Sequence, residues 1–78
     1  MTKIEILGTG CAKCKRLFAN AEQAVKDLKI TADLIKVEDL DEIVNRGVML
    51  TPALFINGEL VAEGRVPCVE EIMAMLKE

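Results

Sequence analysis

The stretch Thr9-Gly10-Cys11-Ala12-Lys13-Cys14 separates an apolar run, Ile4-Glu5-Ile6-Leu7, from a segment with helical periodicity that continues to about Leu28. Two thiols three residues apart in the first turn of a helix share one face of that helix. Their Cα atoms then lie about 5 Å apart, a separation that a disulfide can bridge. The unpaired N–H groups and the dipole at a helix N-terminus favour a thiolate at Cys11, the reactive form of cysteine. The pattern therefore predicts a cysteine pair that can form and open a disulfide with little backbone movement.

The composition indicates a small chain with enough apolar residues for a core. Of the 78 residues, 51% are hydrophobic, and the formal net charge is −3. Aromatic residues make up 3%, with no Trp or Tyr, so the chain has neither the basic stripe nor the stacking rings that nucleic-acid-binding proteins use. No apolar run approaches the length of a membrane span. We therefore expect one domain over residues 1–78, with neither nucleic acid nor a membrane as a partner.

The cysteine count limits the chemistry further. A secreted disulfide scaffold normally has an even number of cysteines, and this chain has three. We also expect no signal peptide, so we interpret the chain as a cytoplasmic protein. A structural zinc site needs four ligands, and one subunit with three cysteines and no histidine does not supply a Cys/His set. Iron–sulfur clusters meet the same shortage. We therefore expect no metal or other cofactor.

Periodicity and turn signals predict the element order β-α-β-α-β-β-α. Strands are expected over residues 1–7, 31–37, 53–56 and 59–62, and helices from Cys11 to about Leu28, from Asp39 to Gly47 and over residues 69–76. Asn57-Gly58 is a hairpin signal between the last two strands. The first strand, the first helix and the second strand form a βαβ unit, which implies parallel pairing. We expect an α/β fold, a four-stranded mixed sheet flanked by three helices.

Three separated segments are expected to meet at one end of this sheet. The first strand runs towards Cys11. If the third strand is antiparallel to the first, its start at Thr51-Pro52 lies at the same end, and so does the end of the fourth strand at Gly64. Cys68 follows Gly64 by four residues and would lie near the same surface.

With these motifs, the chain resembles the thioredoxin-like superfamily over essentially its whole length. It is most similar to the small, glutaredoxin-sized archaeal and bacterial thioredoxin-like redox-active disulfide proteins. The resemblance rests on Cys11-Ala12-Lys13-Cys14 after the first strand, on Thr51-Pro52 before the third, and on Asn57-Gly58 followed by Gly64 and a closing helix. The loop Ala12-Lys13 matches neither the Gly-Pro of ordinary thioredoxins nor the Pro-Tyr of glutaredoxins.

The resemblance implies a role for each matching residue. Cys11 would be the exposed attacking thiolate, and Cys14 the buried resolving thiol. The Thr51-Pro52 bond would be cis, with the Thr51 backbone pairing with a substrate segment beside Gly64. It also implies a thioredoxin-like fold without a prosthetic group.

Two residues near the cysteines are each open to two interpretations. Lys13 is either a solvated lysine or a cation that tunes the reactivity of Cys11 by favouring its thiolate. Cys68 is either a small apolar residue at a helix start or a third thiol that takes part in mixed disulfides.

Residues away from the motif are given structural roles. Glu5 lies near the position where longer thioredoxins keep a buried acid, but we expect a surface glutamate there. We expect the methionines to fill the core or its border, because a flexible thioether fits irregular gaps; they are Met49, Met73 and Met75.

The functional hypothesis is an enzyme, a thiol–disulfide oxidoreductase of the protein disulfide reductase type, acting as a monomer. Its expected partners are disulfide-containing proteins or small molecules and, as reductant, a thioredoxin-reductase-like enzyme or a low-molecular-weight thiol. One alternative is a soft-metal (Cu or Zn) carrier that uses the same C-x-x-C pair. Such carriers end in a strand and usually have Met two residues before the first Cys, where this chain has Thr9. The other alternative is a non-catalytic adaptor that binds an extended peptide at Thr51-Pro52.

Overall fold

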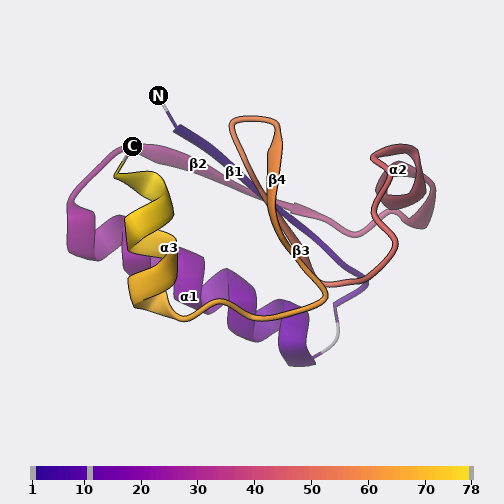
Figure 1. The fold of residues 1–78 in the computed structure, drawn as a ribbon, viewed down its shortest axis with the longest axis horizontal. Coiled ribbons are helices and arrows are strands. Elements are labelled where there is room, and N and C mark those ends of the chain that lie inside the picture. The colour runs from indigo at the N-terminus through magenta and orange to yellow at the C-terminus, as the bar shows by residue number, and fades with distance from the viewer. Residues whose placement is uncertain (1, 11, 78) are drawn as a thin grey trace.

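The structure, a computed structural model, describes residues 2–10 and 12–77 (Figure 1). Its elements are β1 (Thr2–Leu7), α1 (Ala12–Leu28), β2 (Ala32–Val37), α2 (Leu40–Asn45), β3 (Ala53–Ile56), β4 (Glu59–Glu63) and α3 (Val69–Leu76). This order and the mixed sheet confirm the predicted fold class. Cys11, the predicted attacking thiolate, lies outside the described residues.

The sheet has the strand order β2-β1-β3-β4. β1 pairs with β2 in parallel, as the βαβ unit requires, and with β3 in the antiparallel direction. In this register Leu7, the last residue of β1, is the partner of both Val37 at the end of β2 and Ala53 at the start of β3. The end of β1, which leads into the cysteine motif, therefore lies between the end of β2 and the start of β3.

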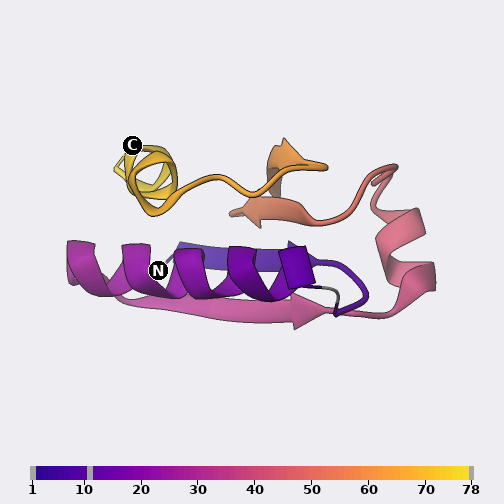
Figure 2. The same ribbon diagram turned by 90° about the horizontal axis from the view of Figure 1, so that it is seen from below.

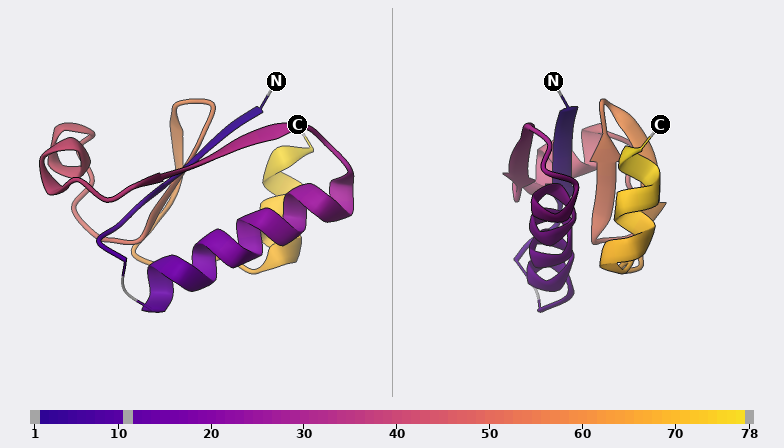
Figure 3. Two further views of the ribbon diagram at one scale, coloured as in Figure 1. Left: turned by 180° about the vertical axis from the view of Figure 1, so that it is seen from behind. Right: turned by 90° about the vertical axis from the view of Figure 1, so that its left-hand side faces the viewer.

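Helices lie on both sides of this sheet. α1 and α3 pack against each other and against one face, and α2 lies apart from them, at the end where β1 terminates (Figures 1 and 2). The left view of Figure 3 also shows α2 apart from α1 and α3. The larger buried cluster, between the sheet and α1 and α3, consists of Ile4, Ile6, Leu17, Ala21, Ala24, Leu54, Ile56, Ala62 and Ile72. A second cluster beside α2 consists of Leu7, Ile43, Val48, Ala53 and Phe55. Within the described residues, no helix is long and apolar enough to cross a membrane.

The short helix α2 begins and ends where the sequence predicts. Asp39 is its N-cap, and the Asp39 side chain accepts a hydrogen bond of 2.9 Å from the Asp41 backbone N–H. This bond satisfies one of the donors that a helix start leaves unpaired. Arg46 is the C-cap of the helix, and Gly47 follows with a φ of 78°, a conformation that glycine adopts without a Cβ penalty.

Glu5 is buried, so its predicted surface position is wrong. It is only 4% exposed, and its carboxylate accepts two hydrogen bonds from the Arg46 guanidinium, of 2.6 and 3.1 Å. These hydrogen bonds hold the pKa of the Glu5 carboxyl below its ordinary value, although burial alone would raise it. The Arg46 guanidinium also lies over the Phe55 ring, 5.5 Å from its centroid. The ion pair therefore fastens the end of α2 to the centre of the sheet.

Candidate active site

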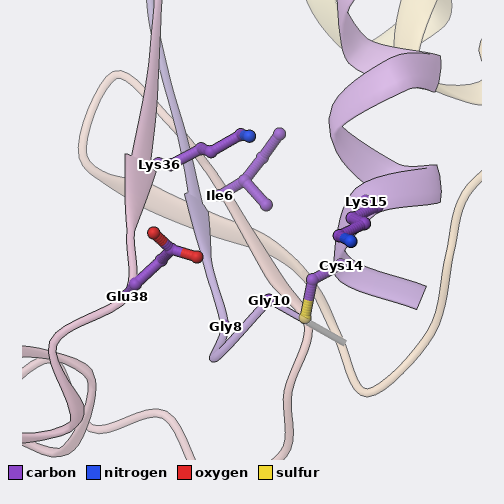
Figure 4. A pocket seen from close by; sticks show the side chains of 7 residues that line it. All are labelled: Ile6, Gly8, Gly10, Cys14, Lys15, Lys36 and Glu38. Carbon is purple, nitrogen blue, oxygen red and sulfur yellow. The ribbon is translucent and has the colours of Figure 1, made fainter. Parts of the chain in front are cut away.

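Cys14 lies in the first turn of α1, with its side chain directed towards the end of β1. It is 6% exposed, and in Figure 4 its sulfur points to the loop that contains Gly8 and Gly10. A Cβ added at Gly8 would overlap Cys14 Sγ and would lie 3.8 Å from Pro52 Cα. Glycine at position 8 therefore lets the end of β1, the first turn of α1 and the segment before β3 approach one another.

Replacing Gly8 by Ala is expected to lower the free energy of unfolding by about 1–3 kcal/mol, the usual effect of an added methyl group in a packed interior. The added methyl group would overlap Cys14 Sγ. The next nearest atom, Cys14 Cβ, would lie 3.3 Å from it, so the sulfur is the main obstacle. Urea unfolding measures the loss.

A double-mutant cycle isolates this contact. In a Cys14→Ala background the sulfur is gone, so the Gly8→Ala penalty is expected to shrink. An equal penalty in both backgrounds would show that the overlap with sulfur is not its cause.

The segment before β3 is bonded to the end of β4. The Thr51-Pro52 peptide bond is cis, and the Pro52 carbonyl accepts a hydrogen bond of 2.9 Å from the Gly64 backbone N–H. Pro52 is buried and Thr51 is exposed. Gly64 has a φ of 71°, and a Cβ there would lie 3.0 Å from Cβ of Leu50. Cys14, Pro52 and Gly64 thus gather at one end of the sheet, with Gly8 between Cys14 and Pro52.

Met49 is not a core residue, and that prediction is wrong. It is 88% exposed, and the following Leu50 is 62% exposed. Val48, just before them, is buried beside α2 instead. The two apolar side chains therefore lie at the surface immediately before Thr51.

A small pocket opens beside Cys14, and it includes residues for which the sequence suggested no site role. Its lining residues are Ile6, Gly8, Gly10, Cys14, Lys15, Lys36 and Glu38. Figure 4 shows Lys36 and Glu38 coming from the end of β2 towards the space between β1 and α1. The Gly8 N–H donates to the Val37 carbonyl at 2.9 Å, which fixes this neighbourhood. The parallel pairing of β1 with β2 could have indicated from the sequence that Lys36 and Glu38 lie near the end of β1.

The charges around this pocket are mixed. The Lys36 ammonium lies 4.5 Å from the centroid of the Phe18 ring, in a cation–π contact. Lys15 brings a second ammonium group and Glu38 a carboxylate. Two ammonium groups and one carboxylate thus line the pocket beside Cys14.

The two candidate tuning residues lie in different places. Lys13 is exposed in the first turn of α1. Cys68 is the exposed N-cap of α3, without a side-chain capping bond. The carbonyl of the preceding residue, Pro67, accepts a hydrogen bond of 3.0 Å from Asn20, six residues beyond Cys14, which is about 9 Å along a helix. The structure therefore places the start of α3 against the middle of α1 and does not bring Cys68 beside Cys14.

The described residues contain no cluster of metal-ligating side chains. Among residues 2–10 and 12–77, no group of three His, Cys, Asp or Glu side chains is placed to hold a metal ion. The described element order, β-α-β-α-β-β-α, also differs from the βαββαβ order of the soft-metal carrier scaffold.

Comparisons with known proteins agree with this geometry. A family model described as a thioredoxin domain matches residues 2–77. The thioredoxin of Methanothermobacter thermautotrophicus is 46% identical over 76 residues, 97% of this chain and 99% of that protein. The thioredoxin of Methanocaldococcus jannaschii is 43% identical over 77 residues, 99% of this chain and 88% of that protein.

A solved structure extends the likeness to the fold. It is thioredoxin-2, described as a component of the malaria parasite protein secretion machinery, and it matches with a TM-score of 0.74 at 18% identity. The match covers 99% of this chain and 82% of that one, and at this identity it supports the fold alone. The two archaeal relatives and the family model confirm the resemblance predicted from the motifs. The chain therefore belongs to the thioredoxin family and is a thiol–disulfide oxidoreductase.

Proposed function

We propose that the protein reduces disulfides with Cys11 as the attacking thiolate and Cys14 as the resolving thiol. Cys11 attacks one sulfur of the substrate disulfide, a mixed disulfide forms, and the other substrate sulfur leaves as a thiolate that takes up a proton. Cys14 then loses its proton and attacks Cys11 Sγ. The second substrate thiol is released, and a Cys11–Cys14 disulfide remains. Two electrons pass from the protein to the substrate.

The burial of Cys14 is the observation that carries this assignment of roles. At 6% exposure, with its sulfur against Gly8, Cys14 is shielded from a bulky substrate. Cys11 is three residues earlier in the sequence, the separation that permits a disulfide in a helical turn. A shielded thiol next to a more reactive one is suited to the second, intramolecular step.

The segment before β3 supports a role in holding the substrate. Proline has no N–H, and the Pro52 carbonyl is bonded to Gly64, so a substrate segment would pair with the backbone of Thr51. Thr51 is exposed, and Pro52 lies close to the Gly8 and Cys14 contact. We assign Thr51, Pro52 and Gly64 to substrate binding and Lys13 to tuning of Cys11.

The substrates in this proposal are disulfides of proteins or small molecules. A thioredoxin-reductase-like enzyme or a low-molecular-weight thiol would return the Cys11–Cys14 pair to the dithiol state. A reducing compartment such as the cytosol suits this direction of electron flow.

A turnover assay tests the proposal. With dithiothreitol as the electron source, the purified protein is expected to accelerate the reduction of an insulin-type disulfide, followed by precipitation of the released chain. Protein whose thiols have been alkylated beforehand is the control and is expected to be inactive. A rate with active protein no higher than that of dithiothreitol alone would refute the function.

A further inference from the structure

Two consecutive residues at the end of β4 bond to the two sides of Thr51. The Glu63 carboxylate accepts hydrogen bonds from the backbone N–H groups of Met49, at 2.7 Å, and Leu50, at 3.2 Å, both through Oε2. The next residue, Gly64, donates its N–H to the Pro52 carbonyl at 2.9 Å. The backbone of Thr51 is therefore held between two points that are both fixed to β4.

The anchoring residue, Glu63, is part of the sheet. It is the cross-strand partner of Ala53, the first residue of β3 and fully buried. Hydrogen bonds to an ionised carboxylate are stronger than those between neutral groups. Since Met49 and Leu50 lie in a connecting segment rather than in a helix or strand, these two bonds replace the hydrogen bonds of regular structure. They reduce the freedom of the segment before a substrate arrives.

The same two residues carry apolar side chains that lie in solvent. With both N–H groups turned towards Glu63, the side chains of Met49 and Leu50 remain at the surface, 88% and 62% exposed. The Leu50 side chain lies near Gly64, because a Cβ added at Gly64 would be 3.0 Å from Leu50 Cβ. The outcome is an apolar surface directly before Thr51.

We propose that Glu63 is a positioning residue for substrate binding. It holds the segment 49–51 in place, and a protein substrate then binds to the Thr51 backbone and to the side chains of Met49 and Leu50. The inference rests on the proposed function and adds to it a residue for which the sequence motifs indicate no role. Glu63 does not touch the reacting sulfur atoms in this proposal. Its effect is to pre-organise the surface that the substrate contacts.

The test uses single-turnover kinetics with the pre-reduced protein. Glu63→Ala is expected to raise the half-saturating concentration of an insulin-type protein disulfide about five- to tenfold, with the limiting rate nearly unchanged. The rate constant for a small aromatic disulfide, which is too small to span the segment 49–51, is expected to stay at the wild-type value. Urea unfolding confirms that each variant is folded under the assay conditions.

Two matched variants sharpen the result. Glu63→Gln keeps one oxygen that can accept the same N–H groups, so it is expected to recover most of the loss. Glu59→Ala removes a carboxylate from the other end of β4 and is expected to behave as wild type. Amide hydrogen exchange of Met49 and Leu50 is expected to accelerate in Glu63→Ala and not in Glu59→Ala.

A merely structural role for Glu63 would give a different pattern. If Glu63→Ala left the half-saturating concentration unchanged, or slowed both substrates by the same factor, the positioning role would be overturned. A wild-type protein inactive on both substrates would instead refute the proposed function, and the role of Glu63 with it. The two failures are therefore distinguishable.

Discussion

Replacing Cys11 by Ser is expected to abolish the reduction of protein disulfides, with a rate at least about a thousandfold below that of the wild type. A serine hydroxyl does not ionise at neutral pH and does not form a mixed disulfide, so the first step of the exchange is lost. The insulin-type reduction assay with dithiothreitol measures the effect. A Cys11→Ser protein with full activity would refute the assignment of the nucleophile.

Cys14→Ser is the diagnostic partner of this variant. Cys11 can still attack, but the buried thiol that would release the substrate is missing. The mixed disulfide is therefore expected to accumulate and to appear as a covalent complex on a non-reducing gel. Cys68→Ser is the control with a third thiol removed and is expected to retain wild-type activity, because α3 begins beside Asn20 rather than beside Cys14.

The second large effect concerns stability. Arg46→Ala is expected to lower the free energy of unfolding by about 3 kcal/mol at pH 7, because it leaves the buried Glu5 carboxylate without its partner. For a chain of this length, such a loss corresponds to a fall in Tm of more than roughly 10 °C. Thermal and urea unfolding measure it. A loss below about 1 kcal/mol would contradict the importance of the ion pair.

The control keeps Arg46 and removes its exposed partner. Glu42 bonds to Arg46 Nε at 3.2 Å across one helical turn, with its side chain 48% exposed. Glu42→Gln is expected to cost at most about 0.5 kcal/mol, as exposed pairs of this spacing usually do. The contrast between the two variants separates the buried contact from the surface one.

The effect of Arg46→Ala is expected to depend on pH in a defined direction. Arg46 holds the folded-state pKa of Glu5 below its ordinary value of 4.5, mainly through hydrogen bonds. The stability that the pair contributes is therefore fully present above about pH 4.5 and is lost as the pH falls through the folded-state pKa. The difference in the free energy of unfolding between wild type and Arg46→Ala should therefore narrow as the pH falls. Stability measurements between pH 7 and pH 3 test the direction.

Local patterns predicted the fold because its elements depend on local signals. Asp39 and Gly47 mark the ends of α2, and Asn57-Gly58 marks the hairpin, each through the conformation or the hydrogen bond that the residue type favours. The βαβ unit and the hairpin predicted the β1–β2 and β3–β4 pairings, whereas the antiparallel β1–β3 pairing was only a condition that the structure fulfils. These same directions bring Thr51-Pro52 and Gly64 to the end of β1.

The residues that sequence reasoning missed depend on contacts between distant segments. The alternation in β1 shows that Glu5 faces away from Ile4 and Ile6, but that face is buried only because α2 covers it and Arg46, 41 residues later, reaches the carboxylate. Met49 lies at the surface, in a segment whose backbone is bonded to Glu63, 14 residues further on. No local periodicity reports either contact.

Cys68 is a residue that the sequence suggested near the site and that the structure places away from Cys14. Its distance from Gly64 in sequence suggested a place near the site. The connecting segment instead crosses to Asn20 in the middle of α1, where Pro67 is bonded. The path of an irregular segment is decided by such tertiary contacts and not by the number of residues in it.

The most direct test of the central claim is a redox titration of the purified protein in thiol–disulfide buffers, with peptide mapping of the oxidised form. The account predicts one two-electron transition that links Cys11 to Cys14, leaves Cys68 as a thiol, and has a midpoint at or below the cytosolic thiol pool, about −220 mV or lower. Cysteines 11 and 14 that fail to form a disulfide, or a disulfide that involves Cys68 instead, would contradict it.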